Sequence, residues 1–212
     1  MRLIDLTMLS PGEENGHATV EVEEWPVSVG DARYTGMVYG FEHWSMTGTY
    51  IDFPGHLAEF DDGSDAADYP IEKLCDVRAA VVHIDRENRP GRITRAELES
   101  AAPRPAGCEA LVIHALGGKT YYEMGKPPVC LAKDAVEWIV ESGVHLLLSD
   151  VYEDHSDPIG VFADLFAARV ATICCPINLD RLDVPYVRLT CLFPRFAGVT
   201  QIPCRVIARV DE

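Results

Sequence analysis

Short apolar runs recur along the chain and predict its strands. The clearest lie at residues 78–84, 110–114, 146–149, 170–174 and 205–210, and all are rich in valine, isoleucine or leucine. Runs of this length and composition are typical of strands that are buried in a sheet. We therefore expect strands to be spread through the middle and the end of the chain.

Three other segments repeat apolar residues at helical spacing. The segment 94–100 opens with Thr94 and has Glu97 three residues later, which is the pattern of a capping box. The segment 133–142 presents apolar residues on one face and stops at Gly143, and 161–168 follows the same spacing. Because these helices alternate with the predicted strands, the sequence favours an α/β or mixed α+β fold.

Two polar stretches interrupt this pattern. Residues 11–35 are rich in acidic and turn-forming residues and are predicted to be an irregular arm, with a short strand near 17–22. Residues 57–70 carry many carboxylates and an Asp-Gly turn signal, which predicts a solvated loop. The chain is otherwise predicted to be a single domain over 1–212.

The composition narrows the class of protein. The formal charge is −16 and the basic residues are scattered, which excludes a nucleic-acid groove because phosphate binding needs clustered lysine and arginine. No apolar run approaches the ~20 residues that span a bilayer, and the first residues lack the pattern of a signal peptide. We therefore expect a cytoplasmic protein, in which the seven cysteines are reduced thiols.

The candidate chemistry is concentrated in residues 45–56, which spell Ser-Met-Thr-Gly-Thr-Tyr-Ile-Asp-Phe-Pro-Gly-His. Because a histidine side chain titrates near neutral pH, His56 can serve as a general acid or base. Asp52 can orient that imidazole, and Tyr50 can donate a hydrogen bond to a developing oxyanion. These three residues are the predicted catalytic groups.

This stretch resembles the signature of the cyclase family that includes bacterial kynurenine formamidase and isatin hydrolase, His-x-Gly-Thr-His-x-Asp-x-Pro-x-His. The positions that match are Gly48, Thr49, Asp52, Pro54 and His56. Weaker likeness covers most of the remaining chain, from the "IDLT" near its start to the final "GVTQIPCRVIARV". The resemblance implies a swivelling β/β/α domain that acts on a small molecule and assembles as a homodimer or larger homo-oligomer.

The resemblance also implies a zinc or manganese site in the relatives, and this chain lacks most of its ligands. Met46 and Tyr50 replace the two histidines of the signature, and Phe162 and Cys174 fall where a later histidine and a glutamate stand. A thioether, a phenol and a phenyl ring cannot reproduce a site of nitrogen and carboxylate ligands. We therefore expect no metal cofactor.

Three interpretations stay open. In the first, His56, Asp52 and Tyr50 carry out metal-independent ring closure, ring opening, dehydration or isomerisation of a small aromatic or polyketide-like carbonyl compound. In the second, the chain is a metal-dependent amide or lactam hydrolase with atypical ligands. In the third, it is a non-catalytic paralogue kept for ligand binding or assembly.

Each interpretation has its own set of residues. The atypical metal ligands would come from Met46, His56, Cys174 and Cys175, or from Asp150, Glu153, Asp154 and His155. A concave site with an apolar wall would suit an aromatic ligand. The residues predicted to form that wall are Trp44, Met46, Phe53, Phe162 and Cys174.

Overall fold

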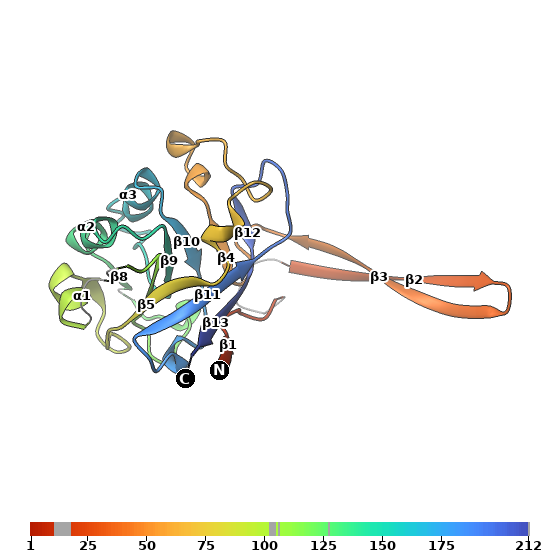
Figure 1. Ribbon diagram of the computed structural model, residues 1–212, viewed down its shortest axis with the longest axis horizontal. Helices are drawn as coiled ribbons and strands as arrows, with labels where there is room; N and C mark the ends of the chain where they lie inside the picture. Colours follow the sequence, from red (N-terminus) through yellow and green to blue (C-terminus); the bar gives the residue numbers. More distant parts are fainter. Residues whose placement is uncertain (11–17, 102–104, 106, 127, 212) are drawn as a thin grey trace.

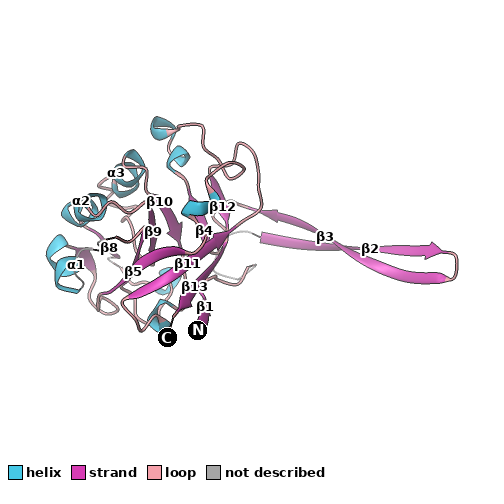
Figure 2. Ribbon diagram, in the orientation of Figure 1, coloured by secondary structure: helices cyan, strands magenta, loops and turns pink. Residues whose placement is uncertain are grey.

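The structure is a computed structural model that describes residues 1–10, 18–101, 105, 107–126 and 128–211. It contains a nine-stranded mixed sheet, flanked on one face by helices (Figures 1 and 2). In spatial order the strands are β1 (Arg2–Asp5), β13 (Arg205–Val210), β11 (Tyr186–Leu192), β5 (Val77–His83), β7 (Ala110–His114), β9 (Leu146–Ser149), β10 (Ala171–Cys174), β4 (Tyr50–Asp52) and β12 (Gln201–Pro203).

The sheet is parallel in its middle and antiparallel at both edges. Strands β5, β7, β9 and β10 run parallel to one another, whereas β11, β13 and β1 on one side and β4 and β12 on the other pair antiparallel. Long connections between the parallel strands hold the helices α1 (Arg95–Ala101), α2 (Lys133–Glu141) and α3 (Val161–Ala167). A mixed α/β fold is therefore observed, as predicted.

Smaller elements complete the chain. A second, parallel sheet pairs β6 (Gly91–Ile93) with β8 (Val129–Leu131). Short 3₁₀ turns occur at η1 (Pro54–His56), η2 (Ala58–Phe60), η3 (Ile71–Lys73), η4 (Tyr121–Glu123) and η5 (Leu179–Arg181). No helix of the described residues is long and apolar enough to cross a membrane.

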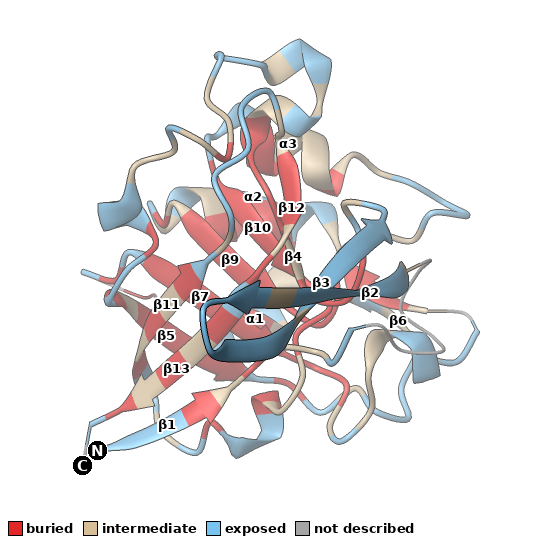
Figure 3. Ribbon diagram, turned by 90° about the vertical axis from the view of Figure 1, so that its right-hand side faces the viewer, coloured by how far each residue is buried: buried red, intermediate tan, exposed pale blue. Residues whose placement is uncertain are grey.

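The main sheet separates two apolar cores. Successive side chains of a strand point to opposite faces, so Leu147 packs under the helices while Leu146 and Leu148 pack on the other side. In β4 the same alternation sends Ile51 to the second core and Tyr50 toward the helices. The sheet curls around the second core, and its buried strands lie side by side in Figure 3.

The strands predicted from apolar runs are confirmed within a residue or so at each end. The prediction of an irregular arm is wrong, because residues 18–35 belong to a long β-hairpin of β2 (Ala18–Val29) and β3 (Ala32–His43). The alternation of Val20 and Val22 with glutamates is a strand pattern, and Gly30, at a φ of +57°, forms the turn. Residues 11–17 of the predicted arm lie outside the described residues.

The capping box predicted at the start of α1 is also present. The Thr94 amide donates to Glu97 Oε2 at 3.0 Å, and the Glu97 amide donates to Thr94 Oγ1 at 3.4 Å. The Arg86 guanidinium also contacts Glu97 Oε2, at 2.9 Å. The cap therefore joins the start of the helix to the loop that follows β5.

Replacing Thr94 with alanine is expected to lower the free energy of unfolding by about 1 kcal/mol, because the first turn of α1 loses a hydrogen-bond acceptor. Urea unfolding followed by circular dichroism measures this change. Thr94→Ser keeps the hydroxyl and is the matched control, expected to unfold with the wild type. Equal stability of Thr94→Ala and the wild type would show that the cap contributes nothing.

Candidate functional site

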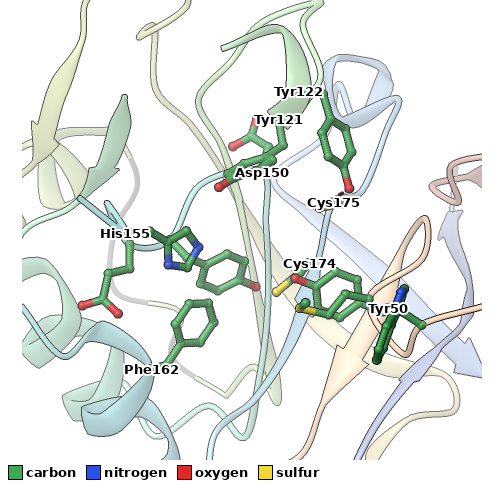
Figure 4. A pocket seen from close by; sticks show the side chains of 12 residues that line it. Tyr50, Tyr121, Tyr122, Asp150, His155, Phe162, Cys174 and Cys175 are labelled. Carbon is green, nitrogen blue, oxygen red and sulfur yellow. Dashed lines mark hydrogen bonds between the residues drawn. The ribbon is translucent and has the colours of Figure 1, made fainter. Parts of the chain in front are cut away.

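A cavity of about 300 Å³ lies where the parallel strands β9 and β10 end (Figure 4). Ligand sites of open α/β sheets form at the carboxyl ends of the strands, where loops replace the sheet. The loop after β9, the end of β10, strand β4, helix α3 and the turn η4 all contribute side chains. The lining residues are Trp44, Met46, Tyr50, Tyr121, Tyr122, Asp150, Tyr152, Glu153, His155, Phe162, Cys174 and Cys175.

Asp52 is buried directly behind this cavity. Strand β4 lies between β10 and β12, and the register places Asp52 opposite Thr172 on one side and Gln201 on the other. Asp52 Oδ2 accepts hydrogen bonds from the Thr172 hydroxyl at 3.4 Å and the Cys174 thiol at 3.7 Å. Asp52 Oδ1 is also buried, yet it accepts no hydrogen bond from the described residues.

The surroundings of Asp52 favour its neutral form. Burial raises the pKa of Asp52 to about 6, while Gln201 and the nearby His56 oppose this rise. An unpaired carboxylate is costly to bury, and holding a proton reduces that cost. Asp52 therefore changes its charge close to neutral pH.

Tyr50 points to the same face of β4 as Asp52 and reaches the cavity. Burial, together with the neighbouring Cys174 and Asp52, raises the pKa of Tyr50 far above its ordinary value. The phenol therefore stays protonated at any physiological pH. It can donate a hydrogen bond to a ligand but cannot act as a base.

Besides Asp52, two of the residues predicted from the sequence lie outside the cavity. His56 is exposed in η1, and its Nε2 accepts a hydrogen bond from the Gln201 amide at 3.2 Å. Phe53 is fully buried in the second core, where its ring packs 4.6 Å from that of Tyr69 and 5.5 Å from that of Phe193. His56 therefore lies near Asp52 on the side of Gln201. Phe53 packs against the opposite face of the sheet.

The remaining predicted wall residues do line the cavity, and three tyrosines join them. Trp44, Met46, Phe162 and Cys174 contribute the predicted part of the wall. Sequence reasoning missed Tyr121, Tyr122 and Tyr152. Tyr152 follows the end of a strand by only a few residues, which is a usable signal, whereas Tyr121 and Tyr122 lie in a loop without periodicity.

The aromatic wall is held by specific contacts. Tyr152 stacks on Phe162 with ring centroids 5.2 Å apart, and its hydroxyl lies 2.8 Å from the carbonyl oxygen of Ile173. On another side the Cys175 thiol approaches the Tyr122 hydroxyl at 3.9 Å. Side chains fixed by such packing present a preformed apolar surface to a ligand.

The carboxylates considered as metal ligands are occupied by local hydrogen bonds. Asp150 accepts hydrogen bonds from the backbone N–H groups of Ala115 and Leu116. Glu153 Oε1 accepts hydrogen bonds from those of Ile159, Gly160 and Val161 at the start of α3. Asp154 accepts the amide and hydroxyl of Ser156. These carboxylates fix the loop that carries His155.

The donor atoms at the signature do not suit a zinc or manganese ion. Burial raises the pKa of the Cys174 thiol well above its ordinary value and that of Cys175 to about 11, whereas metals bind the thiolate. Met46 and Tyr50 add a thioether and a protonated phenol. Among the described residues no group of three or more histidine, cysteine, aspartate or glutamate side chains is arranged to hold an ion.

Comparison with known proteins identifies the family. The sequence profile of the Cyclase family matches residues 4–153, so the chain belongs to this family. It is therefore an enzyme of the cyclase or hydrolase type. Among curated proteins, none matches the sequence.

Solved structures show the same fold. Isatin hydrolase A from Labrenzia aggregata, bound to benzyl benzoate, matches with a TM-score of 0.73 at 18% identity, over 100% of this chain and 94% of that chain. Isatin hydrolase A from Ralstonia solanacearum gives 0.67 at 21% identity, over 98% and 91%. A predicted metal-dependent hydrolase from Bacillus stearothermophilus gives 0.67 at 16% identity, over 98% and 97%. The expected β/β/α fold of the cyclase family is confirmed.

The raised pKa of Asp52 predicts a specific dependence of stability on pH. Between pH about 4 and about 6 the folded protein keeps a proton that the unfolded chain releases, so the free energy of unfolding falls as the pH rises. The loss is at most about 3 kcal/mol. Asp52→Asn cannot titrate, so it should be more stable than the wild type at pH about 7.5 and similar to it at pH about 4.5.

Urea unfolding at both pH values measures the difference between the two proteins. Asp62 is the control with the opposite sign, because its hydrogen bonds to Ser64 hold its pKa below the usual range. Asp62→Asn is therefore expected to be less stable than the wild type at both pH values. If Asp52→Asn is strongly destabilised at neutral pH but not at the lower pH, the prediction is wrong. That result would mean that a cation stabilises the ionised carboxylate of Asp52.

Proposed function

We propose that this protein is a metal-independent cyclase-type enzyme that performs acid–base chemistry on a small aromatic carbonyl compound bound in the cavity behind Trp44. The observation that carries the proposal is the content of the cavity wall. Met46 and Tyr50 stand at the signature positions of the metal-binding histidines, and both side chains line the cavity. A protonated phenol thus stands at the position of a ligand histidine, where it can donate a hydrogen bond to a carbonyl group.

The wall favours a planar, largely apolar ligand. A volume of about 300 Å³ suits a small molecule. Aromatic side chains lie on several sides of it, and rings prefer stacked or edge-to-face contact with one another. The relative from Labrenzia aggregata holds benzyl benzoate, which is an aromatic carbonyl compound of the kind proposed.

Two groups at the cavity can move or hold a proton in this reaction. Tyr50 donates a hydrogen bond to the carbonyl oxygen and stabilises negative charge that develops there. His155 is exposed at the cavity and lies away from Tyr50 in Figure 4, on the side of Phe162. An imidazole in this position can remove a proton from the ligand and return it to another atom of the ligand.

The simplest step is enolisation. The imidazole of His155 takes a proton from the carbon next to the carbonyl group, and the electron pair of that C–H bond forms the enolate. The Tyr50 hydroxyl stabilises the enolate oxygen. The imidazolium then returns the proton to another carbon, which isomerises the compound, or to a leaving hydroxyl group, which departs as water.

Asp52 and His56 act one layer behind the ligand in this proposal. Asp52 accepts a hydrogen bond from the Cys174 thiol and so fixes the Cys174 side chain beside Tyr50. Because its pKa is about 6, a change in its charge alters the field at the phenol near neutral pH. His56 contacts Gln201, which faces Asp52, and so adjusts the same charge from the solvent side.

A ligand-binding protein without catalysis is the second candidate. It is favoured by the engagement of both cavity carboxylates, Asp150 and Glu153, in backbone hydrogen bonds. The cavity then offers few free groups for proton transfer. Binding with no turnover would distinguish this function from the first.

The test uses a panel of aryl alkyl ketones, which carry a proton on the carbon next to the carbonyl group. Chromatography measures turnover, because isomerisation leaves the mass unchanged, and calorimetry measures binding. His155→Gln and Tyr50→Phe should each lower kcat about 100-fold or more, with little effect on Kd, because they remove proton transfer and oxyanion stabilisation. His145→Gln is the matched control, since this half-buried histidine contacts the Lys73 carbonyl away from the cavity. It should leave turnover unchanged.

Chelation separates the alternatives. Turnover that persists in EDTA supports the proposal. Turnover that EDTA abolishes and zinc or manganese restores would contradict it, as would full activity of both His155→Gln and Tyr50→Phe. Binding of a panel compound without any turnover would assign the protein to the second candidate function.

A further inference from the structure

Three arginines form one row across neighbouring strands of the main sheet. Strand β11 lies between β5 and β13, and the register places Arg188 opposite Arg78 on one side and Arg209 on the other. Residues opposite each other in antiparallel strands lie about 5 Å apart and point to the same face, where like charges lower the stability of the sheet. We propose that this arginine row binds the phosphate group of a small ligand, at a site separate from the cavity behind Trp44.

The arginine row lies on a part of the sheet that the helices leave open. Val187 and Leu189 pack into the second core, so Arg188 between them points to the opposite face. No described helix packs extensively against β11 or β13. A pocket of about 420 Å³ lies here, and all three arginines line it. It shares no lining residue with the cavity at the ends of β9 and β10.

The guanidinium of Arg78 is held in place and available to a ligand. Its Cζ lies 4.6 Å from the centroid of the Tyr186 ring. A guanidinium that lies over a ring keeps its N–H groups for other hydrogen bonds. Glu109 accepts a hydrogen bond from the backbone N–H of Arg78, and within the described part of the chain the guanidinium forms no ion pair. Arg78 therefore has donors to offer to an anion.

Asp76 positions the other two arginines. Arg188 Nη1 donates to the Asp76 carbonyl oxygen at 2.8 Å and lies 3.7 Å from its carboxylate, whereas Arg209 Nη1 lies 2.8 Å from the other carboxylate oxygen. Asp76 has a φ of +58°, which is unfavourable for a residue with a side chain. Its amide donates to Thr190 Oγ1 at 3.1 Å, which holds this conformation. The arginine row is thus fixed by specific contacts.

The pocket carries an excess of positive charge. The carboxylates that pair with the arginine row are those of Asp76 and of Asp211, which lies 3.0 Å from Arg209 Nε. Three guanidinium groups against two carboxylates leave one positive charge without a partner. The whole chain has a formal charge of −16 and repels anions in general. An anion bound here is therefore held by the arginines themselves.

The geometry favours phosphate over carboxylate. One guanidinium fork takes up two oxygens of an anion. A carboxylate has only two oxygens, so a single arginine occupies it. A phosphate group has a third terminal oxygen and can accept hydrogen bonds from Arg78 and Arg188 at the same time. The volume of the pocket leaves room for a small organic group on that phosphate.

The experiment titrates the full chain with inorganic phosphate at low ionic strength and measures binding by calorimetry. The wild type should bind about one phosphate per chain, and acetate should bind at least about 10-fold more weakly. Arg78→Lys and Arg188→Lys keep the charge but lose the fork, so each should weaken phosphate binding about 10-fold or more. Circular dichroism should report an unchanged fold for both variants, because neither side chain belongs to a core.

Arg205→Lys is the matched control. Arg205 lies on the same face of β13, pairs with Asp5 and does not line the pocket, so this variant should bind phosphate as the wild type does. No saturable binding of phosphate to the wild type would overturn the proposal. Unchanged binding by Arg78→Lys and Arg188→Lys, an equal loss in Arg205→Lys, or acetate bound as tightly as phosphate would overturn it as well. None of these results depends on whether the chain is catalytic.

Discussion

The site depends on how one carboxyl group is buried between two strands. Strand β4 inserts between β10 and β12, and the register fixes Asp52 between Thr172 and Gln201. One of its oxygens accepts no hydrogen bond from the described residues, and the nearby His56 only partly opposes the effect of burial. Burial then raises the pKa of Asp52 to about 6, which leaves a carboxyl group that can exist with or without its proton at the base of the site.

Burial also raises the pKa values of the neighbours of Asp52. The Cys174 thiol and the Tyr50 phenol both have raised pKa values and stay protonated, so they act as hydrogen-bond donors rather than as anions. A cavity with such a wall excludes water from a bound ring while offering it a donor. In the proposed function, the Tyr50 phenol therefore acts on a carbonyl group through hydrogen bonding in place of metal coordination.

Much of the fold could be predicted from the sequence because buried strands and capped helices leave local patterns. The run at 110–114 and the Thr94–Glu97 pair are examples. The signature around Asp52 indicated the cyclase family. Of the hairpin only a short strand near 17–22 was predicted, because the glutamates and turn-forming residues of the segment favoured an irregular arm over two long strands. The cavity was predicted only in part, since Tyr121, Tyr122 and Tyr152 reach it through tertiary packing. Phe53 was predicted to line the cavity and does not. Side chains alternate along β4, so the residues on either side of Asp52 point to the second core.

We propose that the signature of this chain holds no metal ion. Elemental mass spectrometry of protein purified without chelators or nickel affinity resin tests it most directly. The account predicts far less than one zinc, manganese or copper ion per chain for the wild type. The double variant Met46→His, Tyr50→His restores two imidazoles beside Asp52 and is the positive control, expected to bind about one zinc ion per chain. About one ion per wild-type chain would contradict the account.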